Sequence, residues 1–176
     1  IALLRGGAPV LNEEGASVGG WRTMVQAVSV HTFGLGGDSE VHLDERGHVE
    51  VGPRRVVPLS LLAHRFPPLL EILRAQLAAE EPGAHDGIFA LRQRSLDGAA
   101  STLSGRQAEV WNVLAEGPVA LSELLADPEN GLFRGWALAE LVERGLAIPA
   151  GFTPTDAAHV LGRQRHWSEE AARLGA

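Results

Sequence analysis

The chain has 176 residues, of which 45% are hydrophobic, and a formal net charge of −7 at neutral pH, which predicts one core-forming domain or one domain with a small insert. The negative charge argues against a free-standing nucleic-acid or anionic-membrane binder, because phosphate groups would repel the protein. The absence of cysteine excludes disulfides, thiolate zinc sites and cysteine nucleophiles, and it fits a cytoplasmic location.

The N-terminal stretch is predicted to be extended. Residues 1–4 have the apolar character of a strand end, and Pro9–Leu11 follow a glycine turn as a second extended piece. The β-branched residues of 21–30 favour another strand. Residues 1–4 are too short for a signal peptide, and no apolar run approaches the roughly 20 residues that span a bilayer. We therefore expect no membrane partner. Because no methionine opens the chain, we expect it to be a piece of a larger protein.

A glycine-rich turn lies between two predicted strands within 30–41. Its glycines, Gly34, Gly36 and Gly37, let the backbone approach a ligand or another strand closely. Such a turn can aim backbone N–H groups at an anion, and Ser39 can donate a further hydrogen bond to a ligand. The alternative is a purely structural hairpin turn. Asp38 is interpreted as a solvated turn residue rather than a metal ligand, because a carboxylate beside phosphates without a metal is repelled.

A β-hairpin is predicted after this turn. Val41 and Leu43 alternate with polar residues, Asp44–Gly47 forms the turn, and Val49 and Val51 alternate on the return strand.

After the hairpin, the sequence predicts a connecting segment followed by a helix. Two prolines stiffen the connection at 52–58, and a helix begins at Pro67-Pro68 and ends before 81–83. One face of this helix carries Leu69, Leu70, Leu73 and Leu77. Residues 87–94 indicate a strand, and a boundary is placed in the small, polar stretch 95–102.

Segment 101–150 has the pattern of a winged helix-turn-helix. Ser104 is predicted to cap a helix that runs through Glu116, with a short helix at 122–125 and a third at 133–144, ended by Gly145. Residues 146–148 and 152–153 would form the β-wing. The segment contains three basic and seven acidic residues, and because phosphate contact needs the opposite balance, the pattern favours a packing or protein-interaction module over DNA binding.

The C-terminal segment is predicted to hold two helices. Thr155 is the expected cap of a helix containing Ala157, Val160 and Leu161, and Ser168 caps a final helix over 169–174. Thr155 and Asp156 are explained by helix capping alone. The functional alternative is that this helix start faces a cleft, where Asp156 holds a metal-bound water or a substrate group.

Three segments resemble the A-type, ATP-handling subunit of the hydantoinase/oxoprolinase family. They are HTFGLGGDS at 31–39, VEVGPRR at 49–55 and TPTDAAHVLGR at 153–163. The first and third are similar to the family stretches T-I-G-A-G-G-G-S and T-D-A-x-x-V-L-G-R, and all three occur in family order. Asp38 departs from the pattern where the family has a further glycine, and the family's P-G-P after the G-P is absent. Segment 101–150 has no counterpart in the family pattern.

The resemblance implies an α/β fold of the ribonuclease-H-like, actin-type ATPase kind. We therefore expect a partial ATPase lobe at 1–100, a winged-helix-like insert at 101–150 and C-terminal helices at 151–176 that return to the lobe. The family uses ATP with Mg²⁺ to open a cyclic amide such as 5-oxoproline or a hydantoin. The resemblance assigns nucleotide binding to Gly34, Gly36, Gly37, Ser39, Thr155 and Asp156.

The family's N-terminal phosphate loops do not occur in this sequence, so we expect the chain alone to be inactive. Expected partners are the missing N-terminal part of the same protein, and a B-type hydantoinase subunit or a second copy. The alternative is a non-enzymatic regulatory or subunit-interaction module with a winged helix. The seven histidines show no spacing typical of a zinc site, which needs three or four converging ligands.

Overall fold

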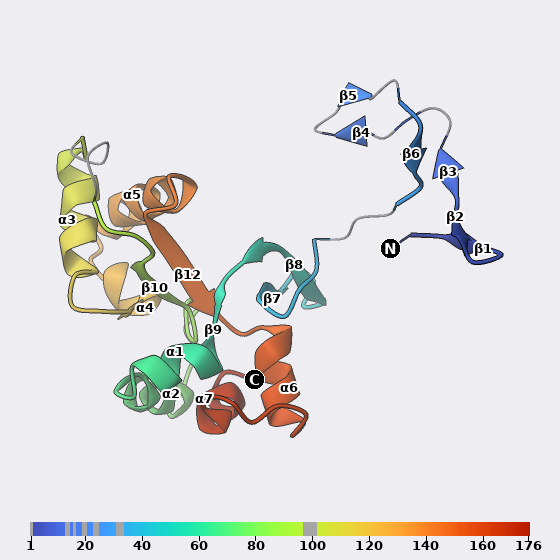
Figure 1. Cartoon of the computed structure of the whole chain (residues 1–176). Helices are drawn as coiled ribbons and strands as arrows, with labels where there is room; N and C mark the ends of the chain where they lie inside the picture. The colour runs from blue at the N-terminus through green and yellow to red at the C-terminus, as the bar shows by residue number, and fades with distance from the viewer. Residues whose placement is uncertain are drawn as a thin grey trace. The chain divides into compact units, whose positions relative to one another are not determined.

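The computed structural model describes residues 2–12, 15, 17–18, 21–22, 25–30, 34–96 and 102–176. These residues form a mixed α/β structure with small sheets and seven helices (Figure 1). The chain divides into two units, residues 1–34 and 35–176, and each is described by itself.

The first unit consists of short antiparallel strand pairs. The pairs are β1 (Leu4–Arg5) with β2 (Ala8–Pro9), β3 (Leu11–Asn12) with β6 (Ala27–Val28), and β4 (Ser17–Val18) with β5 (Trp21–Arg22). None of the hydrophobic side chains described in this unit is buried, and Trp21 is 83% exposed. The described part of the unit therefore has no hydrophobic core.

The strands predicted in this unit are shorter than expected. The strand predicted at 1–4 begins at Leu4, with Ala2 in an isolated bridge to Val30, and residue 1 lies outside the described residues. The predicted piece Pro9–Leu11 is divided between β2 and β3. Of the predicted strand 21–30, the structure has β5 and β6, and residues 23–24 lie outside the described residues.

The predicted hairpin is confirmed as β7 (Ser39–Leu43) and β8 (Val49–Arg55). In its turn, the carboxylate of Asp44 accepts hydrogen bonds from the N–H groups of Arg46 and His48, both at 2.8 Å. The predicted connection at 52–58 is wrong, because β8 continues to Arg55. Cross-strand pairs of Arg54 with Glu40 and of Arg55 with Asp38 extend the strand pairing to this end.

The second unit is built on a four-stranded sheet in the order β11-β10-β12-β9. The strands are β9 (Val57–Pro58), β10 (Phe89–Arg92), β11 (Val119–Ala120) and β12 (Ala147–Gly151). β10 runs antiparallel to both β11 and β12, and β12 runs parallel to β9. The strand predicted within 87–94 is thus confirmed as β10.

The β-wing predicted from residues 146–148 and 152–153 is wrong. β12 is one strand whose neighbours are β10 and β9, so it has no return strand at 152–153. The Phe152 carbonyl accepts a hydrogen bond from the Val41 N–H at 2.9 Å, and Thr153 begins the next helix. Long-range pairing therefore replaces the local hairpin.

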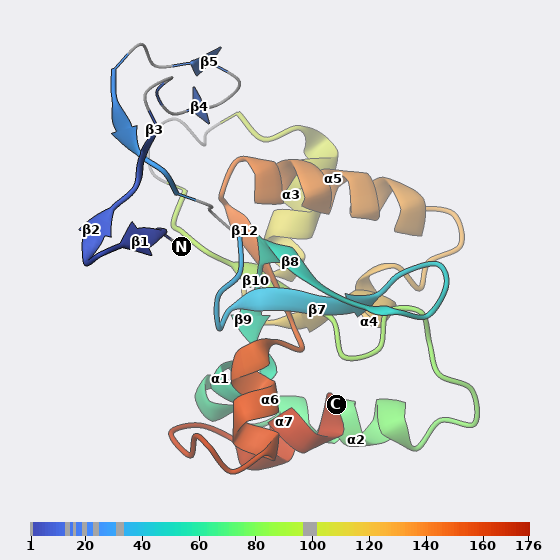
Figure 2. The same cartoon turned by 90° about the vertical axis from the view of Figure 1, so that its right-hand side faces the viewer.

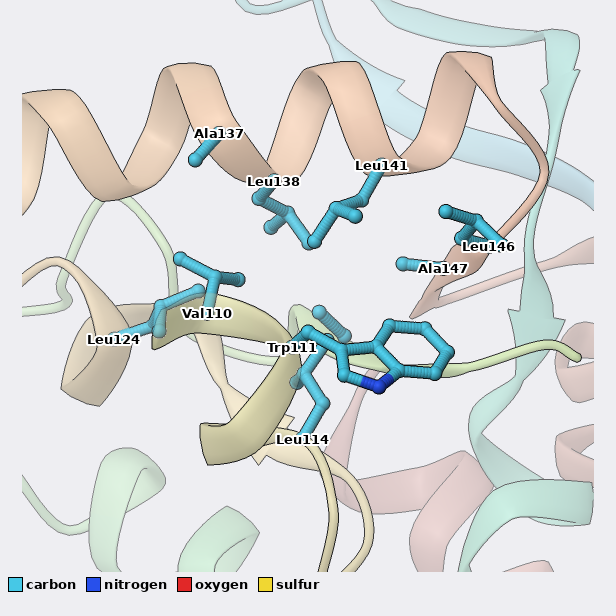
Figure 3. Close-up of a cluster of buried hydrophobic side chains, with 10 residues drawn as sticks. Val110, Trp111, Leu114, Leu124, Ala137, Leu138, Leu141, Leu146 and Ala147 are labelled. Carbon is cyan, nitrogen blue, oxygen red and sulfur yellow. The ribbon is translucent and has the colours of Figure 1, made fainter. Parts of the chain in front are cut away.

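Three helices pack together on one side of this sheet. They are α3 (Gly105–Val113), α4 (Leu121–Leu124) and α5 (Gly131–Glu143). Ser104 and Gln107 form the capping box of α3, which ends at Val113 rather than Glu116. Figure 3 shows side chains of α5 directed toward Val110, Trp111 and Leu114 of the α3 region.

Four more helices lie on the opposite side of the sheet from α3 and α5 (Figure 2). They are α1 (Leu59–Arg65), α2 (Leu69–Leu77), α6 (Pro154–Val160) and α7 (Glu169–Leu174). Residues of α1, α2 and α7 form a second core with Phe89 of β10. The sequence analysis predicted the other three but not α1. No side chain next to α1 in the sequence caps its first turn, so its local signal is weak.

Candidate functional site

The glycine-rich turn contacts the start of α6. The Gly37 carbonyl accepts a hydrogen bond from the Thr155 N–H at 3.0 Å. Two of the three segments that carry the family resemblance, more than one hundred positions apart in the sequence, are therefore neighbours in space.

Hydrogen bonds within the turn hold its shape. The Ser39 N–H donates to the Gly36 carbonyl at 3.1 Å, and the Gly36 N–H donates to Ser39 Oγ at 2.8 Å. Ser39 is completely buried. The Asp38 carbonyl accepts a hydrogen bond from the Val56 N–H at 2.9 Å, which ties the turn to the strand that leads into α1. The turn is thus part of the folded body and not a free loop.

Other side chains lie against two glycines of the turn. A Cβ atom added to Gly37 would lie 2.6 Å from Thr155 Oγ1, closer than any ordinary contact. A Cβ added to Gly36 would overlap the guanidinium of Arg55, which is paired with Asp38. The outer side of Gly37 remains exposed to solvent. The glycines therefore permit close packing on one side and leave backbone accessible on the other.

Asp156 is completely buried and joins two helices. Its Oδ1 accepts a hydrogen bond from the Ser60 N–H at 2.8 Å, and its Oδ2 accepts one from the Leu59 N–H at 3.1 Å. Oδ2 also accepts from the N–H and the hydroxyl of Thr153, at 2.9 and 2.8 Å. One carboxylate thus supplies acceptors to the first turn of α1 and to the capping box of α6.

The cap of α6 is Thr153, so the prediction of Thr155 is wrong. Thr153 is extended, with φ −138° and ψ 165°, and its hydroxyl accepts the Asp156 N–H. Pro154 occupies the first helical position, where its missing N–H is harmless. Thr155 lies inside the first turn and is half-buried.

A buried histidine extends this network and was not singled out by the sequence analysis. His159 Nδ1 donates to the Thr155 carbonyl at 2.8 Å, and Nε2 accepts from the Trp167 N–H at 3.3 Å. The His159 and Trp167 rings stack with centroids 5.7 Å apart. Both ring nitrogens are engaged, so this imidazole has no lone pair for a metal. The sequence signal that could have indicated this contact is the position of His159 four residues after Thr155, one helical turn further along.

Five of the six predicted nucleotide-binding residues belong to the second unit. Gly36, Gly37 and Ser39 form the turn, and Thr155 and Asp156 lie in the first turn of α6 beside it. Gly34 is the last residue of the first unit and is exposed. The structure thus brings the turn and the helix start together.

The carboxylate oxygens beside the glycine-rich turn and the start of α6 are not available as ligands for a magnesium ion. Both oxygens of Asp156 are occupied by protein donors, and Asp38 is paired with Arg55. Within the described ranges, no group of three or more histidine, aspartate or glutamate side chains could hold a metal.

The histidines of the hairpin form two separate pairs. His42 lies 3.3 Å from Glu50, and His48 lies 3.1 Å from Asp44. The hydrogen bond from the His48 N–H, with others from the same turn, lowers the pKa of Asp44 below its usual range. The first is a cross-strand contact between β7 and β8, and the second stabilises the turn.

Three open pockets lie elsewhere on the second unit. One of about 590 Å³ borders α5, one of about 580 Å³ borders α2, and one of about 610 Å³ lies beside Arg92 and Trp111. None of these three is lined by the six predicted nucleotide-binding residues.

No protein-family profile, no curated protein and no solved structure matches this chain. Among the described residues, no helix has the length and apolar character to cross a membrane. The structure defines a mixed α/β protein with small sheets.

Proposed function

We propose that this chain is part of an ATP-dependent enzyme of the hydantoinase/oxoprolinase type, which opens a cyclic amide such as 5-oxoproline or a hydantoin. The observation that supports the proposal is the hydrogen bond from the Thr155 N–H to the Gly37 carbonyl at 3.0 Å. It joins the first and the third segments of the resemblance, which lie far apart in the sequence. The enzyme would be cytoplasmic, with a B-type subunit or a second copy as partner.

In this proposal the glycine turn lies beside the nucleoside of ATP. The exposed Gly37 lets a nucleoside approach the backbone, while Ser39 and Thr155 hold the turn in place. Bound ATP supplies the phosphoryl group that activates the amide. Asp156 acts by positioning α6, since its oxygens accept protein hydrogen bonds, and Mg²⁺ is assigned to no residue of this chain.

We also propose that the second unit combines part of a ribonuclease-H-like lobe with a winged-helix module. The support for the module is the order α3, β11, α4, α5, β12 together with β10 between β11 and β12 in the sheet. In this arrangement β10 occupies the place that the return strand of a wing would take.

The coding sequence upstream of Ile1 provides one test of the enzyme proposal. A G-G-T-x-T-D phosphate loop that runs directly into the first strand supports it. An upstream sequence without such a loop contradicts it and favours the interaction module.

Nucleoside binding by the 176-residue chain provides a second test. We expect adenosine and ATP to shift the backbone amide resonances of residues 35–40 and of Thr155 and Asp156 in a ¹⁵N-labelled sample, while inorganic phosphate alone leaves them unchanged. Shifts confined to other regions, or none at saturating adenosine, would refute the nucleoside role of the turn. We expect no ATP or 5-oxoproline hydrolysis by this chain alone.

The winged-helix module is proposed to bind protein rather than DNA. Segment 101–150 contains three basic and seven acidic residues, so phosphate is repelled. The outward face of α5, which would enter a DNA groove in a DNA-binding winged helix, carries Leu132, Trp136 and Glu143. Salt-sensitive binding in an electrophoretic shift assay with duplex DNA would contradict this role.

A further inference from the structure

We propose that α5 is a dimerisation helix, whose outward face packs antiparallel against α5 of a second copy of this chain. Trp136 of each copy enters the groove beside Ala139 of the other. This inference deepens the protein-interaction role proposed for the winged-helix module and rests on it, but it is independent of the enzyme proposal.

The outward face of α5 exposes large apolar side chains. Leu132 and Trp136, one helical turn apart, are 64% and 58% exposed, whereas Ala137, Leu138 and Leu141 face the core (Figure 3). An exposed tryptophan on a regular helix is typical of a contact surface, since indole contributes much of the energy of interfaces. Leu132 and Trp136 therefore form an unpartnered knob.

The knob is held in place by its neighbours. Phe133 meets the edge of Trp136 with ring centroids 5.5 Å apart, and the Arg106 guanidinium lies 3.9 Å from the centre of the Phe133 ring. Ordering of these rings before contact reduces the entropy lost on binding.

The matching groove lies beside the same helix. A pocket of about 590 Å³ is lined by Ala139 and Val142 of α5 on one side and by residues of α4, β12 and the segment before β10 on the other. Ala139 is small and exposed, so a second helix can approach α5 closely there. A knob and a groove on one surface are self-complementary, which is the requirement for a twofold dimer.

Charge selects the antiparallel orientation. Glu143 is exposed at the C-terminal end of α5, while Arg106 is exposed beside its N-terminal end, where the helix dipole is also positive. With Trp136 opposite Ala139 of the other copy, Glu143 comes level with Leu132 and close to Arg106. A parallel pair would bring like charges together.

The self-association of the 176-residue chain tests the proposal. Sedimentation velocity over a range of concentrations should show a monomer–dimer equilibrium, and Trp136→Glu should shift it to monomer. Leu161→Glu, at a 65% exposed leucine just after α6, is the matched control and should remain dimeric. A wild-type chain that is monomeric throughout, or a Trp136→Glu variant that still dimerises, overturns the proposal.

A charge exchange tests the orientation. Glu143→Arg and Arg106→Glu should each weaken dimerisation by about tenfold or more, and an equimolar mixture of the two variants should recover it as a heterodimer. If the mixture dimerises no more tightly than either variant alone, the antiparallel register is refuted. Far-ultraviolet circular dichroism of each variant confirms that these exposed substitutions leave the fold intact. A monomeric wild type would refute only self-association, whereas DNA binding would refute the interaction role itself.

Discussion

The carboxylate of Asp156 accepts a hydrogen bond from the backbone N–H of Ser60 at 2.8 Å, although 96 positions separate the two residues in the sequence. Through this bond the start of α6 supplies a cap for α1, which has none of its own. The contact explains why a buried charge is tolerated here, because backbone and hydroxyl donors surround it.

We predict that Asp156→Ala destabilises the second unit by about 3 kcal/mol or more, because it leaves several buried donors unpaired. Asp156→Asn should have a smaller effect, since one oxygen remains to accept. Urea unfolding followed by circular dichroism measures both. Glu45→Gln, at an exposed residue of the hairpin turn, is the control. If Asp156→Ala lowers the free energy of unfolding no more than the control does, the carboxylate does not join the two helices.

We predict that Ser60→Ala is neutral or stabilises the protein by about 1 kcal/mol. Ser60 is buried, and among the described residues its hydroxyl is the buried side-chain polar atom with no hydrogen-bond partner, so its removal relieves a desolvation penalty.

The matched variant is Ser168→Ala. The Ser168 hydroxyl accepts the Ala171 N–H at 3.1 Å as the cap of α7, so its loss should destabilise by about 1 kcal/mol. The midpoint temperature of thermal unfolding should therefore fall for Ser168→Ala and stay unchanged or rise for Ser60→Ala. Similar destabilisation in both would mean that the Ser60 hydroxyl has a partner.

We predict that Gly37→Ala destabilises the turn by about 1–3 kcal/mol, because the new methyl group would lie 2.6 Å from Thr155 Oγ1. Thr155→Ala removes that oxygen, so the double variant should be more stable than the sum of the two single effects by about 1 kcal/mol. Gly105→Ala, with open space around its Cβ position, is the control and should be harmless. Additive effects at Gly37 and Thr155 would mean that the two residues do not touch.

We predict that Asp127 makes the stability of α5 sensitive to acid. A hydrogen bond from the Asn130 side chain, followed by those from the Glu129 and Asn130 N–H groups, lowers the pKa of Asp127. A carboxyl with a lower pKa in the folded state contributes stability above its ordinary range, and this contribution is lost as the pH falls through the lowered value.

The difference in free energy of unfolding between wild type and Asp127→Asn should therefore be largest near neutral pH and narrow in acid. Urea titrations at several pH values measure it. Glu129→Gln provides the exposed control, with no difference expected at any pH. A difference for Asp127→Asn that is independent of pH would exclude the charged carboxylate as its source.

Some elements were predictable because their signals are local. The hairpin β7–β8 follows from alternation around Asp44–Gly47, and the Ser104 cap of α3 needs only the residues that follow it. Gly145, with φ +61°, ends α5 as its position predicts. In each case a few residues close together in the sequence are enough to determine the local structure.

Other features depended on residues far apart in the chain. Asp156 accepts hydrogen bonds from the Leu59 and Ser60 N–H groups, 97 and 96 positions away, and β12 has no wing because its neighbours are β9 and β10.

At the candidate site, the amino-acid sequence by itself determined the glycine-rich turn, since only glycine leaves room for such close backbone approach. Only the tertiary structure decided that Gly37 meets Thr155 and that Asp156 is occupied by α1, because hydrogen bonds between distant segments exist only once the chain has folded.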